Sequence, residues 1–210
     1  MVDPRIARTR QSLEEALFAL ARERELDAIS VADITERAGV NRSSFYQHYA
    51  DKDTLLADAI DAAAEEAGAD LPMPFELTVA PPAVLVHYLK HIEENADVYR
   101  RMFAAHGSGV AVDRLRSRIE VIARSGIDGA PVPLADGIPH DVLAAGLAGS
   151  VLAVIQVWVA RDPRPPAETA AMWVWQVLLG PALTQQAAAL SAQRTLNAPS
   201  TPKGGPTARS

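Results

Sequence analysis

The chain of 210 residues contains no cysteine. Disulfide bonds, thiolate catalysis and cysteine-based zinc sites are therefore excluded, and the composition suits a reducing compartment. No stretch alternates apolar and polar residues for long, whereas apolar residues recur with a helical period almost everywhere. The first residues also lack the apolar run of a secretory signal. We expect an all-α protein located in the cytoplasm.

Basic residues are not in excess, because 26 Asp and Glu outnumber 20 Lys and Arg and the net charge is −6. A nucleic-acid partner would therefore have to bind a local basic cluster, since affinity for phosphates comes largely from basic side chains that displace counterions. The N-terminal quarter offers a set of basic residues that we expect to gather at one tip: Arg5, Arg8, Arg10, Arg42 and Lys52. Binding through such a tip should depend strongly on salt.

The segment Val142–Ala160 lacks charged residues and is long enough to cross a bilayer. Its internal Gln156 and the lack of a flanking basic cluster favour a soluble helix. A soluble helix that is apolar all round must be covered on all sides, and Gly146 and Gly149 would let another helix approach closely. We therefore expect a homodimer and no membrane partner; a membrane-associated hairpin is the alternative, and it would need detergent for solubility.

Residues 30–56 carry a dense set of local signals. Ser30 can cap a helix that begins at Val31, with Asp33 completing a capping box. Gly39 suits the positive φ that ends such a helix, and Asn41 can cap the next one. These signals predict two helices joined by a tight turn. Helix-turn-helix units place their second helix in a DNA groove.

The second helix of this unit has two different faces. Phe45 and Tyr49, four residues apart, form its inner stripe. The remaining residues form an outer face that is rich in hydrogen-bond donors and poor in hydrocarbon: Arg42, Ser43, Tyr46, Gln47 and His48. After it, Asp51 caps a further helix whose first turn contains Lys52, so the ammonium and the helix N–H groups could meet one phosphate.

At these positions the chain resembles the TetR family of bacterial transcriptional regulators. The resemblance covers roughly the first quarter of the chain and rests on Thr9, Arg10, Leu13, Ala16, Leu20, Ser30, Val31, Ile34, Ala38, Gly39, Val40, residues 45–49, Lys52 and Leu55. Three positions depart from the family pattern. Glu25 stands where a helix-ending Gly is usual, Ile29 where Thr is common, and Ser43 where Gly is common. The first departure predicts a different exit from the first helix.

The resemblance and the chemistry of the donors give the expected DNA contacts. Arg42 and Gln47 are expected to read bases, because Arg pairs with guanine O6 and N7 and Gln pairs with adenine. The other candidates, expected to hold phosphates and set the register, are Ser30, Ser43, Ser44, Tyr46, His48 and Lys52. The partner would be a double-stranded palindromic operator.

Three regions are predicted: a helix-turn-helix domain over residues 1–52, a ligand-binding and dimerisation domain over 53–194, and a disordered tail over 195–210. Loops are expected at Gly68–Pro82 and Gly126–Pro139. The predicted helices after the DNA-binding unit are Thr54–Ala67, Ala83–Asn95, Ala96–His106, Val112–Ser125, His140–Ala160 and Pro166–Ala192, the last bent or broken at Gly180-Pro181.

The aromatic residues of the C-terminal half could fill the core or the dimer interface. The family resemblance instead implies a cavity for a small effector, with a lining that we expect to include Tyr88, His91, Phe103 and Trp158. An apolar wall with a few polar groups suits a hydrophobic or aromatic effector. His87, His91 and Glu94 have a spacing that could hold a metal, but a solvated or pocket-lining pair of histidines is the favoured interpretation.

No nucleophile-elbow, phosphate-loop or zinc-protease motif occurs in the sequence. We therefore expect no enzyme activity, no metal and no cofactor. The sequence and the resemblance together predict a ligand-responsive regulator, a repressor in the commoner case, that binds DNA as a homodimer. The alternative is a small-molecule-binding or scaffold protein whose helix-turn-helix no longer reads DNA, which the acidic net charge and Ser43 would favour.

Overall fold

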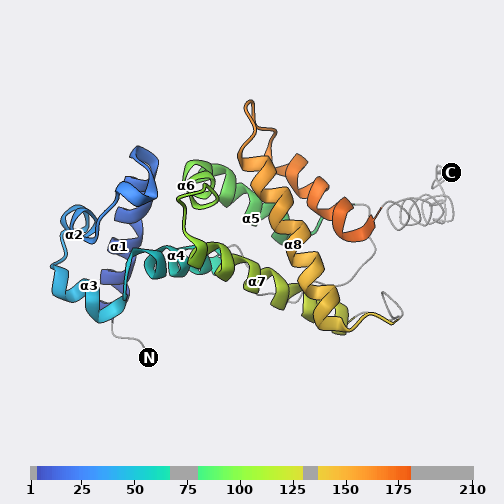
Figure 1. Ribbon diagram of the computed structural model, residues 1–210, viewed down its shortest axis with the longest axis horizontal. Coiled ribbons are helices and arrows are strands. Elements are labelled where there is room, and N and C mark those ends of the chain that lie inside the picture. Colours follow the sequence, from blue (N-terminus) through green and yellow to red (C-terminus); the bar gives the residue numbers. More distant parts are fainter. Residues whose placement is uncertain (1–3, 67–79, 130–136, 181–210) are drawn as a thin grey trace, which may run out of the picture.

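The computed structural model describes residues 4–66, 80–129 and 137–180, and regular structure in these ranges is helical throughout (Figure 1). The expected all-α fold is confirmed. In chain order the helices are α1 (Pro4–Glu23), a short 3-10 helix (Leu26–Ala28), α2 (Val31–Ala38), α3 (Arg42–His48), α4 (Lys52–Glu66), α5 (Ala83–Glu94), α6 (Ala96–Met102), α7 (Gly109–Asp128), α8 (His140–Val159) and a helix over 167–180.

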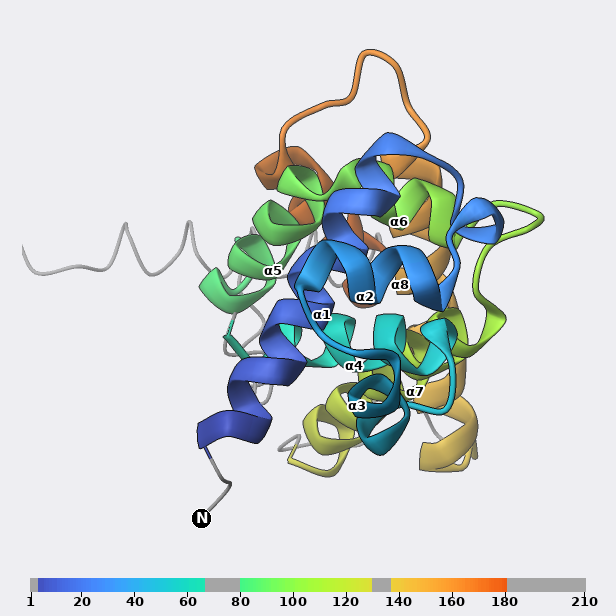
Figure 2. The same cartoon turned by 90° about the vertical axis from the view of Figure 1, so that its left-hand side faces the viewer.

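The helices α1, α2 and α3 form a head at one end of the molecule (Figures 1 and 2). Its core is built from the apolar stripe of α1, one face of α2 and the inner side of α3. Leu13, Leu17, Ile34 and Phe45 are each no more than 1% exposed. Burial of four large apolar side chains over so short a segment fixes the two short helices against α1.

Helix α4 runs from the head into the body, which contains α5 to α8 and the helix over 167–180 (Figure 1). Leu55, Leu56 and Ile60 of α4 are buried, and one hydrophobic cluster continues from the head through α4 into the body. The expected boundary between residues 52 and 53 falls in the first turn of this unbroken helix. The division into two domains at that point stays a prediction.

Among the described helices of the body, α6 and α7 end or begin three or more residues away from the bounds that the sequence pattern predicted. Helix α6 ends at Met102 instead of His106, because the chain turns back there. A Cβ atom on Gly107 would lie 2.0 Å from the Met102 carbonyl oxygen, so this turn requires glycine. Helix α7 begins three residues before the expected Val112, where the Ser108 hydroxyl caps it by accepting from the Ala111 N–H at 3.2 Å.

Helix α7 also continues to Asp128, three residues into the expected loop Gly126–Pro139. The Asp128 carboxylate lies 2.7 Å from Nδ1 of His140, the first residue of α8. Gly180 has a φ of 69°, in the left-handed region where helices end, which agrees with the break expected at Gly180-Pro181. Most of the loop Gly68–Pro82, the predicted helix beyond residue 180 and the predicted tail lie outside the described residues.

Candidate functional site

The helix-turn-helix has the local geometry that its sequence predicts. The Ser30 hydroxyl accepts from the Asp33 N–H at 3.2 Å, and the Asp33 carboxylate accepts from the Ser30 N–H at 2.8 Å. Gly39 ends α2 with a φ of 65°. The Asn41 side chain then caps α3 by accepting from the Ser44 N–H at 2.8 Å. Each of these end contacts joins residues no more than four positions apart in the chain. The two helices are therefore stabilised by local interactions.

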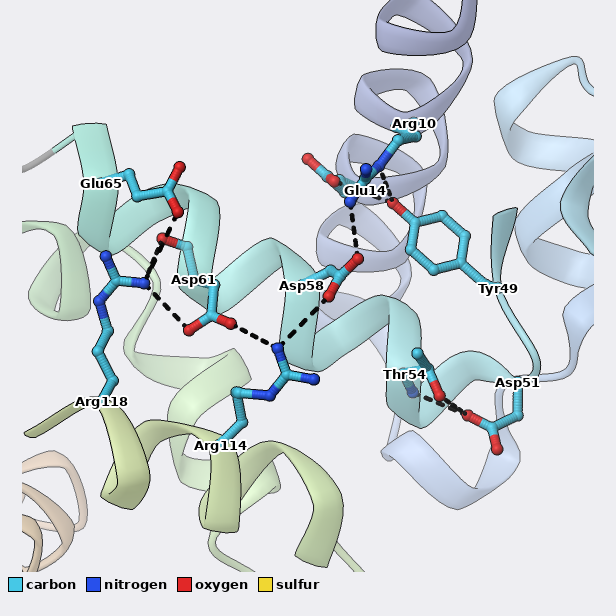
Figure 3. Close-up of polar contacts among 10 residues, drawn as sticks. All are labelled: Arg10, Glu14, Tyr49, Asp51, Thr54, Asp58, Asp61, Glu65, Arg114 and Arg118. Carbon is cyan, nitrogen blue, oxygen red and sulfur yellow. Dashed lines mark hydrogen bonds and ion pairs between the residues drawn. The ribbon is translucent and has the colours of Figure 1, made fainter. Parts of the chain in front are cut away.

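The inner side of α3 is fixed to α1. Phe45 is fully buried and Tyr49 is 2% exposed. The Tyr49 hydroxyl accepts from Arg10 Nε at 3.1 Å and donates to Glu14 Oε1 at 3.1 Å, as Figure 3 shows. Burial raises the pKa of Tyr49 to about 12 and also raises the pKa of Glu14. The tyrosine therefore stays protonated and anchors the C-terminal end of α3.

The outer face of α3 is open to solvent. Arg42, Ser43 and Gln47 are exposed, and Tyr46 is 50% exposed. The Arg42 guanidinium lies over the Tyr46 ring, 5.7 Å from its centroid, and donates to the Tyr46 hydroxyl at 3.3 Å. The Ser43 hydroxyl donates to the Asn41 side chain at 2.7 Å. A rigid row of donors and one oriented cation therefore faces outward from the head.

A hollow of about 390 Å³ lies between α1 and α3, beside this face. It is lined by Arg5, Ile6, Thr9, Ser44, Gln47 and His48. Three of the predicted DNA contacts, Ser44, Gln47 and His48, lie together in this hollow, whereas Ile6 and Thr9 were not expected there. These residues form the α1 side of the hollow. Arg5 and Thr9 are four residues apart on one helix, and this spacing is the signal that could have identified them.

Lys52 and Arg10 are placed differently from their predictions. The Lys52 ammonium donates to the carbonyl oxygens of Leu26 and of Ile29, the latter at 2.8 Å, instead of pointing away from the protein. Leu26 begins the short 3-10 helix and Ile29 follows it, so the ammonium turns inward to bond carbonyls at both ends of this turn. Arg10 is also drawn away from the expected basic tip, because it pairs with Asp58 at 2.7 Å. Ser30 remains exposed, with its hydroxyl engaged in the capping box.

Charged side chains on three helices connect the head to the body through α4 (Figure 3). Asp58 of α4 faces Arg10 of α1, and it lies 3.8 Å from Arg114 of α7. One turn further, Asp61 accepts from Arg114 at 2.9 Å and from Arg118 at 3.1 Å. The helix that carries the head therefore has its carboxylates bonded on one side to α1 and on the other side to α7.

The four expected effector contacts do not form one group. Tyr88 and His91 of α5 stack with ring centroids 6.3 Å apart. Phe103 is partly buried against the hydrophobic cluster at the end of α6. Trp158 is fully buried, and its Nε1 donates to the Pro165 carbonyl at 2.8 Å, which places it in the core, the other role that the sequence allowed. In the ranges described, no three His, Cys, Asp or Glu side chains are grouped to hold a metal ion.

A family model of bacterial regulatory proteins of the tetR family matches residues 14–59, from α1 into α4. An uncharacterised HTH-type transcriptional regulator of Bacillus subtilis, YxbF, is 38% identical over 66 residues. That match covers 31% of this chain and 17% of the relative. The chain therefore matches less than a fifth of the length of that relative.

Solved structures resemble a much larger part of the chain. A TetR transcriptional regulator from Streptococcus agalactiae 2603V has a TM-score of 0.60 and 24% identity, covering 83% of this chain and 95% of the other. FadR of Thermus thermophilus, a TetR-family repressor solved with lauroyl-CoA, has a TM-score of 0.51 and 19% identity, covering 81% and 93%. At such identities the likeness shows the fold alone. Residues 14–59 of this chain match the tetR family of bacterial regulatory proteins, and its described part has the fold of TetR-family regulators.

Proposed function

We propose that this protein is a homodimeric transcriptional regulator that binds a palindromic operator and is released from it by a small hydrophobic or aromatic effector. We propose a repressor, the commoner role among proteins of this type. The observation that carries the proposal is the contrast between the two sides of α3. Its inner side is fully buried and hydrogen-bonded to α1, while its outer side presents oriented donors to solvent.

In this proposal α3 enters the major groove. Arg42 and Gln47 read base edges, which is the chemistry of guanidinium and carboxamide groups on purines. Phosphates are held by short or terminal donors around them: Ser30, Ser43, Ser44, Tyr46 and His48. Arg5 and Thr9, on the α1 wall of the hollow, extend this set. Lys52 is assigned to support of the head instead, because its ammonium donates to two backbone carbonyls.

Dimerisation is supported by the free side of α8. Exposed positions recur along it at intervals of three or four residues: Val142, Gly146, Gly149, Ala153 and Val157. Val142 and Val157 are 58% and 57% exposed. An added Cβ at either glycine would meet nothing within 4 Å, so the packing of one chain does not require glycine there. A second copy packed on this face would explain both the glycines and the apolar surface.

The effector is proposed to bind in the body and to act through α4. It shifts the protein toward a state whose heads no longer match half-sites about 34 to 36 Å apart, one turn of DNA. Such a shift can be no larger than the difference in affinity between the two states. The FadR structure was solved with lauroyl-CoA, a molecule with an apolar acyl chain, and this supports an effector with a hydrophobic part.

A soluble, cytoplasmic protein without enzyme activity is part of the same proposal, because the family and the structural neighbours are transcriptional regulators. Among the described helices, α8 is long and apolar enough to cross a membrane by length and composition. In the proposed dimer, the apolar surface of α8 packs against a second copy of the chain and needs no bilayer. Solubility of the purified protein without detergent would separate the two interpretations.

The proposal is tested by binding of the purified protein to the intergenic DNA beside its own gene across a salt series. Wild type should bind specifically, with an affinity that falls steeply as salt rises. Arg42→Ala and Tyr46→Ala should each weaken binding about tenfold or more, because they remove the oriented cation or the ring that holds it.

The matched control for this experiment is Arg116→Ala. Arg116 is an exposed arginine of α7 that pairs with Asp113 at 3.9 Å, so its loss changes the net charge equally but leaves the head intact. Equal and weak binding by wild type and both head variants would contradict DNA reading. That result would favour the small-molecule-binding or scaffold alternative.

A further inference from the structure

Helices α5 and α6 bury three polar groups together. Tyr88 is 8% exposed and Tyr99 is fully buried. The His91 ring stacks on Tyr88 at 6.3 Å between centroids and meets Tyr99 edge-on at 6.0 Å. We call these three residues the α5–α6 trio. In the part of the chain that the structure describes, the two tyrosine hydroxyls and His91 Nε2 are buried and have no hydrogen bond of regular geometry, although the two hydroxyls lie close enough to act on each other.

Three buried polar atoms without partners are costly to the folded protein, because each has given up its bonds to water. Natural proteins rarely keep such atoms without a reason, and a group of three in one place is informative. Burial raises the pKa of Tyr88 to about 12 and the pKa of Tyr99 well above its ordinary value. Both hydroxyls therefore keep their protons and can donate.

The hydrogen-bond pattern also fixes which His91 nitrogen carries the proton. Arg22 Nη2 of α1 donates to Asn95 Oδ1 at 2.6 Å, which orients the Asn95 amide with its nitrogen toward His91. That nitrogen donates to the His91 carbonyl at 3.0 Å and lies 3.4 Å from His91 Nδ1. Since Nδ1 faces a donor, it must accept, and the proton of the neutral ring sits on Nε2. Burial lowers the pKa of His91, which favours this neutral form.

The trio thus consists of groups that can each donate, with no formal charge among them. The charges around it oppose an anion. Glu94 and Glu66 act on His91 from α5 and α4. Arg118, the cation that acts on Tyr88, is already bonded to Asp61 at 3.1 Å. A carboxylate bound at these donors would face the negative charges of Asp61, Glu66 and Glu94, whereas a neutral oxygen acceptor would satisfy the donors without any charge being desolvated.

We propose that the Tyr88 and Tyr99 hydroxyls and His91 Nε2 recognise a neutral carbonyl oxygen, such as that of a ketone, ester or amide, on the effector. This inference rests on the proposed function only in taking the body as the effector-binding part of the molecule. It names the chemistry that the effector must carry. The aromatic rings of the trio supply the apolar surface on which the rest of such a molecule would lie.

The first test measures thermal stability of the full chain without DNA. Tyr88→Phe and Tyr99→Phe each remove a buried hydroxyl that lacks a hydrogen bond of regular geometry, so each should raise Tm, by about 2 to 4 °C. The matched control is Tyr49→Phe, which removes a hydroxyl bonded to Arg10 and Glu14 and should lower Tm. A fall in Tm for both trio variants, like that of the control, would overturn the proposal.

The second test uses three probes of similar size: acetophenone, ethylbenzene and benzoate. Binding to the full chain is followed by NMR with ¹⁵N-labelled histidine. Acetophenone should bind at least about tenfold tighter than ethylbenzene, because a factor of about ten in affinity corresponds to one buried hydrogen bond. Its binding should also shift the His91 Nε2 signal. Tyr99→Phe should remove most of that preference.

Equal binding of acetophenone and ethylbenzene, tighter binding of benzoate, or binding of none of the three would each overturn the carbonyl assignment. Because both tests use free protein, failure to bind operator DNA would leave their outcome unchanged. The two proposals can therefore fail separately.

Discussion

Arg101 shows how one side chain can replace a helix-ending glycine. Glu25, at the position after α1 where glycine is usual, has φ −63° and ψ 149°, an extended conformation. The Arg101 guanidinium, from α6 of the body, donates to the carbonyls of Ala21 and Arg24, the latter at 2.6 Å, and pairs with Glu25 at 3.2 Å. The last carbonyls of the first helix are thus satisfied from the body instead of by a left-handed cap.

We expect Arg101→Met to lower the free energy of unfolding by about 2 to 4 kcal/mol, because it leaves two carbonyls without their charged donor while keeping the apolar stem. Chemical denaturation of the full chain measures this change. Arg100→Met is the matched control, since Arg100 pairs with Asp97 at the surface and should cost less than about 1 kcal/mol. Equal losses in the two variants would contradict the capping role.

At the scale of the element, α2 depends on its N-terminal capping box. Hydrogen bonds from the Ser30 hydroxyl, the Ser30 N–H and Arg24 lower the pKa of Asp33 from 3.8 to about 2. A carboxyl whose pKa is lower in the folded state stabilises the fold above its unfolded pKa and loses that contribution as pH falls through the folded pKa. The stability that Asp33 adds should therefore be complete above pH 4 and decline toward pH 2.

Asp33→Asn should make the dependence of unfolding free energy on pH shallower between pH 4 and pH 2, because the amide does not titrate. Denaturation at several pH values in this window measures the slope. Asp27→Asn, an exposed residue in the adjacent 3-10 helix, should keep the wild-type slope. A wild-type slope in Asp33→Asn would show that the capping box does not control acid stability.

Helix α4 is the element that connects the recognition helix to the body. Its first turns pack in the head core through Leu55 and Leu56, and its carboxylates Asp58 and Asp61 bond to arginines of α1 and α7 (Figure 3). If α7 moves relative to α4, either these ion pairs break or α4 moves together with α7. In the proposed function, these ion pairs are the link through which an effector in the body acts on the head.

At the scale of the whole molecule, the free face of α8 sets the expected assembly. Gly149 is exposed on that face, with open space where a side chain would stand. Gly149→Glu should therefore leave one chain intact but place a charge in the dimer interface, where it would be desolvated without a partner. Sedimentation velocity should show a dimer for wild type and a monomer for the variant.

A matched control for the dimer is Gly109→Glu. Gly109 is exposed at the start of α7, away from the α8 stripe, and a Cβ added there also meets nothing within 4 Å. This variant should sediment as wild type does. A Gly149→Glu protein that remains a dimer would show that the copies associate through another surface.

The sequence by itself determined the local geometry of the DNA-reading unit. The Ser30 and Asp33 capping box, the turn at Gly39, the Asn41 cap and the buried Phe45 all depend on partners within a few residues or on an apolar period. Such interactions are set by backbone geometry, so spacing alone predicts them. The all-α fold follows from the helical period at which apolar residues recur along the chain.

Only the tertiary structure decided the roles of residues whose partners are distant in the chain. Lys52 turns inward to carbonyls 23 and 26 residues away, and Arg101 caps a helix about 80 residues before it. Tyr99 joins Tyr88 and His91 because α6 folds back on α5, and Arg22 of α1 orients the amide that fixes the His91 proton. Long polar side chains can reach many partners, and burial selects among them, so their roles emerge only when the helices have packed.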